Sequence, residues 1–231
     1  FAREKGYFDG VNKDFSFANA YAPLDFGARR YCEARVWSYF NMFTARGNEF
    51  LPYILGDTDT PMPLFVKPDR KISVQDVKNA MRDHYEGTPL DISKDFGAGP
   101  YHTPYRLSPL SFKVGDKEYF NERPISTQQS GFVFVAQMRS TLPDAIGGVL
   151  WFGTDDANMT VFTPVYCCTD KVPVCYSRVD GADYITFSWN SSFWIFNWVS
   201  NMVYPRYDLM IGDVRATQNE LETTFNEAQE G

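Results

Sequence analysis

The chain of 231 residues is 44% hydrophobic and 17% aromatic, which is enough to bury a substantial core and argues against disorder. A net charge of −7 disfavours nucleic acid as a partner, because phosphate binding draws on clustered Lys and Arg. The longest apolar runs, 132–136 and 193–196, are far shorter than the roughly 20 residues needed to cross a bilayer, so we expect no membrane span.

The first third of the chain is predicted to hold two helices and a turn-rich connection. Residues 28–43 place apolar and small side chains near one face of a 3.6-residue period, which predicts a helix. Residues 44–72 are punctuated by proline and glycine. A second helix is expected from Ser73, a good N-cap with Asp76 three residues later, to Gly87.

A stiff loop and then a series of strands are predicted for the middle of the chain. Residues 87–109 are rich in proline and glycine, which excludes regular structure. Beyond Asn121 the pattern changes to apolar runs separated by Pro, Gly and Asp. Several runs lack alternation, which predicts burial on both faces. The expected strands are 131–138, 147–153, 159–166 and 184–188.

The C-terminal part is predicted to be helical. Ser191 is expected to cap a helix that is apolar on most sides and therefore mostly buried. Pro205 should kink or end it, and a more polar helix is expected over 209–229. Strands flanked by helices indicate an α+β fold.

Three segments resemble peptidase family C69, the dipeptidases of the N-terminal-nucleophile hydrolase superfamily. They are 85–91 (Tyr-Glu-Gly-Thr-Pro-Leu-Asp), 97–106 (Gly-Ala-Gly-Pro-Tyr-His-Thr-Pro-Tyr-Arg) and 121–131 (Asn-Glu-Arg-Pro-Ile-Ser-Thr-Gln-Gln-Ser-Gly). The resemblance implies a four-layer αββα sandwich, of which this chain supplies part. It implies no cofactor.

The resemblance also implies hydrolysis of dipeptides through an acyl-enzyme on an N-terminal cysteine, whose own α-amino group is the base. The chain begins with Phe1, so we expect an internal fragment without the nucleophile, inactive by itself. It would be the central to C-terminal portion of one domain, with 191–231 as a helical C-terminal part. Expected partners are a dipeptide or short peptide and the remainder of its own polypeptide; a homo-oligomer is allowed. An exported protein is favoured over a cytoplasmic one.

The candidate site residues come from the third segment. Arg123 can receive a substrate carboxylate through two parallel hydrogen bonds; the alternative is an ion pair with Glu122 or another acid that ties down the loop. Asn121 is the candidate oxyanion donor. A run of hydroxyls and amides can position the scissile amide or instead satisfy the loop backbone: Ser126, Thr127, Gln128 and Gln129.

Other polar residues have weaker assignments. Four could frame the mouth of the pocket: Asp91, Asp95, His102 and Arg106. His84 is expected to be a surface or boundary histidine with a partner. Asp155 and Asp156 are expected to form a turn, with cation or ammonium binding as the alternative.

The sequence offers no metal site, because its two histidines and four cysteines lack ligand spacing. Cys168 and Cys175 can form a bridge, but we expect all four cysteines, including Cys32 and Cys167, to be buried free thiols. Two alternative functions remain. One is an acyl-amide hydrolase of the same superfamily, and the other is a non-catalytic binding domain on that scaffold.

Overall fold

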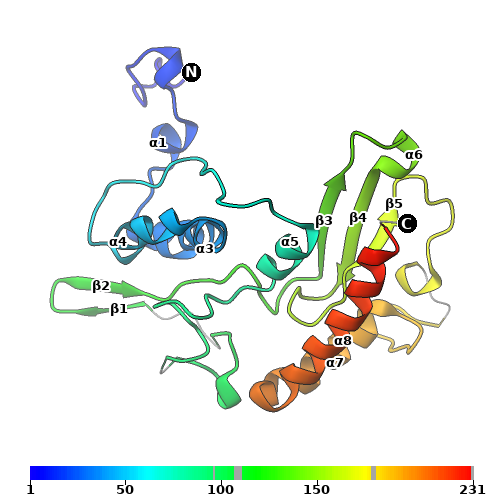
Figure 1. Cartoon of the computed structure of the whole chain (residues 1–231). Coiled ribbons are helices and arrows are strands. Elements are labelled where there is room, and N and C mark those ends of the chain that lie inside the picture. Colours follow the sequence, from blue (N-terminus) through cyan, green and yellow to red (C-terminus); the bar gives the residue numbers. More distant parts are fainter. Residues whose placement is uncertain (96, 107–110, 178–180, 230–231) are drawn as a thin grey trace. The chain divides into compact units, whose positions relative to one another are not determined.

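The computed structural model describes residues 1–95, 97–106, 111–177 and 181–229 (Figure 1). The chain divides into two compact units, which we describe separately. Unit 1 comprises residues 1–69 and 109–123, and unit 2 comprises residues 70–108 and 124–231. None of the helices in these described ranges is long and apolar enough to cross a membrane.

Unit 1 consists of short helices and one antiparallel hairpin. Trp37 lies at its centre, fully buried, and its indole Nε1 donates to the carbonyl of Gly47 at 3.0 Å. A Cβ on Gly47 would lie 2.3 Å from Asn41 Cα, so only glycine permits this close approach. The elements are η1 (Asn12–Asp14), α1 (Phe17–Tyr21), α2 (Phe26–Ala28), the π-helical η2 (Arg29–Glu33), α3 (Ala34–Phe43), η3 (Ala45–Phe50), α4 (Leu51–Leu55), β1 (Ser111–Val114) and β2 (Lys117–Phe120).

The helix predicted over 28–43 is present, but it is interrupted by the π-helical turn η2. Hairpin β1–β2 was not predicted. It pairs Ser111 with Phe120 and Val114 with Lys117, and most of its side chains are exposed. A short two-stranded ribbon with little buried surface leaves a weak signal in the sequence.

Unit 2 is organised around a three-stranded antiparallel sheet with the order β3-β4-β5 (Figure 1). One face packs its inward side chains, among them Val135 and Trp151, against α5 and α8, which contribute Val77 and Phe225. The mixed helix and sheet content confirms the predicted α+β class. The elements are α5 (Val74–Ala80), η4 (Pro100–His102), β3 (Phe132–Met138), α6 (Asp144–Gly147), β4 (Gly148–Thr154), β5 (Thr163–Tyr166), η5 (Val174–Tyr176), α7 (Ser192–Val203), η6 (Tyr204–Arg206) and α8 (Tyr207–Glu227).

The opposite face of this sheet corrects one expectation. Strand β3 alternates between buried and exposed positions, with Phe132 61%, Phe134 50% and Met138 70% exposed. Burial on both faces is therefore wrong for this strand within the described chain. No strand forms at 184–188, where residues 184–186 are bends and residues 187–188 have no regular structure.

Helix α5 begins as predicted and ends earlier. Ser73 and Asp76 form a complete capping box. The helix stops at Ala80 rather than Gly87: the next backbone hydrogen bonds, from Arg82 to Asn79 and from Asp83 to Ala80, span three residues instead of four, and Tyr85 has a left-handed backbone (φ 66°). Strand β5 is also shorter than the predicted strand 159–166. It begins at Thr163, because residues 156–160 form a turn.

The two C-terminal helices are separated by η6, which contains Pro205, as predicted. Helix α7 was expected to be mostly buried, and this is wrong. Phe193 is 39%, Trp198 48% and Met202 40% exposed.

Candidate functional site

In unit 2, the polar segments converge on one end of the sheet, where β3 begins and β4 ends. The backbone N–H of Asp155, just after β4, donates to the carbonyl of Gly131, just before β3, at 2.9 Å. The N–H of Ser126 donates to the carbonyl of Asp83 at 3.1 Å. The loop 97–106 joins them through Thr103, whose hydroxyl donates to the carbonyl of Tyr204.

Asp155 lies at the centre of this end of the sheet. It is 6% exposed and has a left-handed backbone (φ 67°), and its carboxylate accepts a hydrogen bond from the Ser200 hydroxyl on α7. Burial, together with the charge of the adjacent Asp156, raises the pKa of Asp155 from 3.8 to about 6. The carboxyl group is thus held at the boundary between its neutral and charged forms near pH 6.

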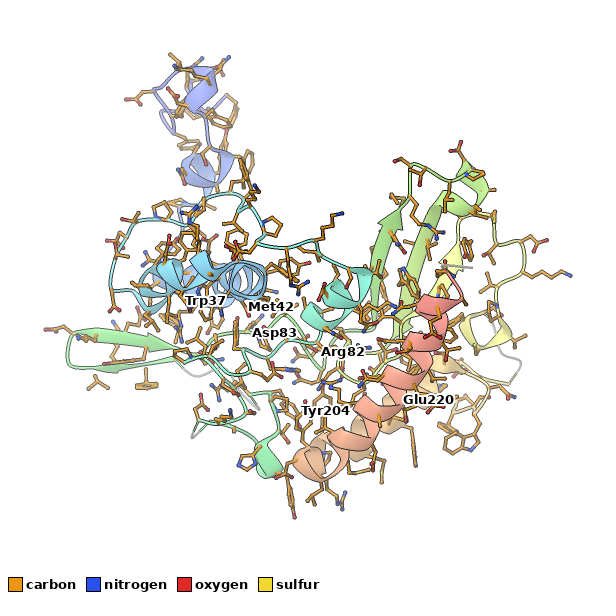
Figure 2. The ribbon with its side chains drawn as sticks, in the orientation of Figure 1. Trp37, Met42, Arg82, Asp83, Tyr204 and Glu220 are labelled. Atoms are coloured by element: carbon orange, nitrogen blue, oxygen red, sulfur yellow. The ribbon has the colours of Figure 1, made fainter. Side chains whose placement is uncertain are left out.

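Asp156 is fully buried and holds the following turn together. Its Oδ1 accepts from the backbone N–H groups of Asn158 at 2.7 Å and Met159 at 3.1 Å. Its Oδ2 accepts from the phenol of Tyr204, which is labelled in Figure 2, at 2.9 Å. Burial raises the pKa of this carboxyl too. The turn predicted at Asp155–Asp156 is confirmed, and its burial was not foreseen.

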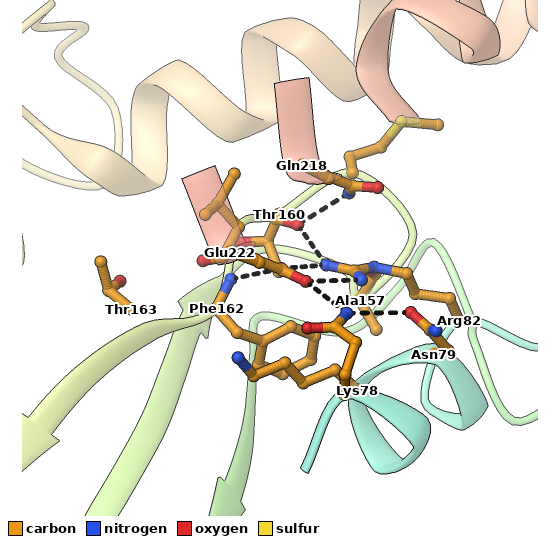
Figure 3. A network of polar contacts seen from close by, with 12 residues as sticks. Lys78, Asn79, Arg82, Ala157, Thr160, Phe162, Thr163, Gln218 and Glu222 are labelled. Carbon is orange, nitrogen blue, oxygen red and sulfur yellow. Dashed lines mark hydrogen bonds and ion pairs between the residues drawn. The ribbon is translucent and has the colours of Figure 1, made fainter. Parts of the chain in front are cut away.

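A buried ion pair supports the same turn from the other side (Figure 3). Arg82 donates to the two carboxylate oxygens of Glu222 on α8 at 2.5 and 3.1 Å, and also to the carbonyls of Ala157 and Thr160. Arg82 is 7% and Glu222 is 1% exposed. One Glu222 oxygen also accepts from the N–H of Phe162 at 2.9 Å, so the pair connects the segment that follows α5, the turn and α8.

His84 lies within this buried region. It is 1% exposed, and its Nδ1 is 3.0 Å from Oε1 of Glu86. The expected partner is present, but the expected surface or boundary position is wrong. The neighbouring Asp91 is also buried and accepts from the N–H of Gly87 and the hydroxyl of Ser93, so it braces its own loop.

The predicted substrate-binding run differs in exposure along its length. Ser126 is 2% exposed, and its Oγ has no hydrogen-bond partner among the residues that the structure describes. The Thr127 hydroxyl lies 3.3 Å from that of Ser130. Gln128 is half-buried and Gln129 is exposed. Because a buried hydroxyl normally finds a partner, Ser126 is the most unusual member of the run.

Asn121 and Arg123 belong to unit 1. Asn121 is buried, and its Nδ2 donates to the carbonyl of Glu122 at 3.0 Å. The carboxylate of Glu122 pairs with Arg30 of η2 at 2.8 Å in a buried ion pair. The guanidinium of Arg123 lies 5.1 Å from the ring centre of Tyr31, and the residue is exposed. Sequence reasoning missed Arg30, which is far from Glu122 in the chain.

Two residues proposed for the pocket mouth make polar contacts within unit 2. Arg106 pairs with Asp95 through both carboxylate oxygens. His102 is exposed and its Nδ1 lies 3.2 Å from Asp208 of α8. These contacts give both residues a role in fixing the loop.

The cysteines are free, and burial is wrong for three of them. Cys32, Cys167 and Cys168 are exposed, and Cys175 is half-buried and not bridged to Cys168. The N–H of Cys167 donates to the carbonyl of Gly148, which places it at the end of the sheet away from Asp155. The described residues contain no group of three or more His, Cys, Asp or Glu side chains arranged to hold a metal.

Comparisons with known proteins agree with these motifs. The model of peptidase family C69 matches residues 1–220. A probable dipeptidase of Salmonella dublin is 31% identical over 72% of this chain and 33% of its own length. A probable dipeptidase B of Lactococcus lactis subsp. lactis is 24% identical over 96% of this chain and 44% of its own. The chain thus spans less than half the length of these curated relatives, and it belongs to peptidase family C69.

Proposed function

We propose that this chain forms part of a dipeptidase that hydrolyses the peptide bond of dipeptides. The observation that carries the proposal is that two family-like segments, 97–106 and the unit 2 part of 121–131, reach the end of the sheet at Asp155 and Asp156. The names of the relatives support the same class of substrate. In this proposal the chain is a portion of a single domain, with 191–231 as its helical C-terminal part.

The proposed chemistry is that of a cysteine N-terminal nucleophile. The thiolate attacks the peptide carbonyl and its α-amino group takes up the thiol proton. The C–N bond then breaks, the amine leaves with that proton, and water hydrolyses the acyl-enzyme. Asn121 is our candidate donor to the oxyanion, since a side-chain amide is a hydrogen-bond donor and its Nδ2 is oriented by the bond to the Glu122 carbonyl.

We propose that the nucleophile is none of the four cysteines in this chain and that the chain alone is inactive. Cys167 and Cys168 follow β5 at the far end of the sheet from Asp155. The test is hydrolysis of dipeptides by the purified chain and by its Cys32→Ala and Cys175→Ala variants. Activity that either substitution abolishes would overturn this part of the proposal.

Arg123 is the proposed anchor for the carboxylate of the dipeptide. Three features support it: its exposure, its position over the Tyr31 ring and the buried Arg30–Glu122 pair beside it, which fixes the local backbone. In the full-length polypeptide, we expect Arg123→Gln to raise KM for a dipeptide by roughly 30-fold, the value of a charged hydrogen bond. The C-terminal amide of the same dipeptide should be much less affected.

Arg46→Gln is the matched control, because Arg46 is an exposed arginine whose ion pair with Glu49 lies on the surface. Equal losses for the acid and the amide would contradict the anchor. Preference of the full-length polypeptide for acyl-amides over dipeptides would instead favour the related amide-hydrolase function.

The hydroxyls and amides of 126–129 are proposed to position the scissile amide. Ser126 has the best support, because its buried Oγ lacks a partner within the described residues and can accept or donate once substrate is bound.

The four-layer αββα sandwich remains the proposed fold of the whole domain. The apolar side chains on the outer sheet face, Phe132, Phe134 and Met138, suit the packing of a second sheet.

A further inference from the structure

A patch of exposed aromatic and apolar side chains extends along α7 and the loop before it. No residue from 184 to 204 is charged. We call the exposed members of this stretch the aromatic patch: Tyr184 (84% exposed), Ile185 (75%), Phe187 (42%), Trp189 (61%), Phe193 (39%), Trp198 (48%) and Met202 (40%). Soluble proteins seldom expose a contiguous apolar surface of this kind unless it binds something.

Ring contacts join the aromatic members of the patch from Phe187 to Trp198. Trp189 lies edge-on to Phe187 at 4.7 Å and to Trp198 at 5.4 Å between ring centres. Trp194 contacts Phe187, and its indole Nε1 donates to the carbonyl of Asp183 at 2.8 Å. These contacts hold the loop against the helix, and the rings of Phe187, Trp189 and Trp198 form a contiguous cluster.

The patch borders an apolar cavity between α7 and α8. The cavity has a volume of about 300 Å³. Trp198 and Met202 belong to both the patch and the cavity wall. The rest of the wall is mainly apolar, with Met159, Phe196 and Met210 among its members. One surface thus contains projecting rings and a hollow that accepts apolar groups.

The size of the patch matches one side of a stable interface. The exposed fractions correspond to roughly 800 Å², because a fully exposed aromatic side chain presents on the order of 200 Å². Standard interfaces bury about 800 Å² on each partner. Binding of the patch to an anionic membrane is disfavoured, since the stretch has no Lys or Arg and the chain carries a charge of −7.

We propose that the aromatic patch is the interface of a symmetric dimer of this chain. A two-fold axis brings the same surface of each copy together, so such a surface must fit itself. The projecting Trp189 ring of one copy can enter the α7–α8 cavity of the other, and the reverse contact follows by symmetry. The stretch 184–204 contributes no charge to this contact, and the cavity wall includes one carboxylate, that of Asp213, which is exposed.

The oligomeric state of the purified chain tests the proposal. Light scattering after gel filtration should give twice the chain mass of 26.5 kDa at a chain concentration of about 100 µM. Trp189→Glu should weaken dimerisation by at least roughly 30-fold, the effect of losing a central aromatic contact. Phe65→Glu is the control, because Phe65 is 80% exposed and lies in unit 1; this variant should remain dimeric.

Photo-crosslinking tests the geometry. With p-benzoylphenylalanine in place of Trp189, the crosslink between copies should fall on Met202 or Met210 in the cavity wall. A monomeric wild-type chain would overturn the proposal. This holds even if the patch of the monomer binds lipid vesicles or another polypeptide. A dimer that Trp189→Glu leaves unchanged, or a crosslink outside residues 159–218, would do the same.

Discussion

Asp155 is predicted to make the native state less stable as the pH rises. Its pKa is about 6 in the folded protein and near 3.8 when exposed in the unfolded chain. Folding therefore takes up a proton between these values, and the native state is most favoured below pH 3.8. The advantage of the neutral form is lost as the pH rises through 6.

The magnitude follows from the two pKa values. The difference of about 2 units corresponds to roughly 3 kcal/mol, and the group is almost fully buried. Asp155→Asn removes the charge while its amide oxygen can still accept from Ser200. Asn also tolerates the left-handed backbone at this position. We expect the variant to be up to about 3 kcal/mol more stable than wild type at pH 8 and of similar stability at pH 3.5.

The assay is urea denaturation at fixed protein concentration from pH 3.5 to 8, because a dimer would make stability depend on concentration. The difference in unfolding free energy between wild type and Asp155→Asn removes the contributions of the other titrating groups. Asp156 contributes to this difference only through its interaction with Asp155. Asp170→Asn, an exposed carboxylate in the same unit, should show no such trend. A stability difference that is the same at pH 3.5 and pH 8 would refute the reasoning.

Three further variants test the interior of unit 2. Arg82→Gln should lower the free energy of unfolding by about 3–5 kcal/mol, because it leaves Glu222 buried without its partner, whereas Arg46→Gln on the surface should cost less than about 1 kcal/mol. Thermal or urea unfolding measures both. Ser126→Ala should raise the free energy of unfolding by about 1 kcal/mol, since it removes a buried hydroxyl without a partner in the described chain. A lower free energy of unfolding in this variant would contradict the reasoning. Tyr204→Phe should cost about 1–3 kcal/mol by removing the donor to Asp156.

Local sequence signals determined the parts of the fold that depend on neighbouring residues. The start of α5 follows from Ser73 and Asp76, because a capping box is formed within one turn of chain. Pro205 separates α7 from α8 because it cannot continue a helix without losing a hydrogen bond. The turn at Asp155–Asp156 and the main strands were predictable for the same reason. The polar segments that carry the family resemblance were also visible in the sequence, and with them the membership of peptidase family C69.

The tertiary structure alone decided the features that join distant residues. Arg82 and Glu222, or Arg30 and Glu122, carry no mutual signal in the sequence, since a charge pattern does not specify its partner across the chain. The burial of His84 and Asp155 depends on which segments cover them. The exposure of α7 is the reverse case: its apolar sequence predicted burial, but burial requires a second surface, and within the described chain one side of this helix has none.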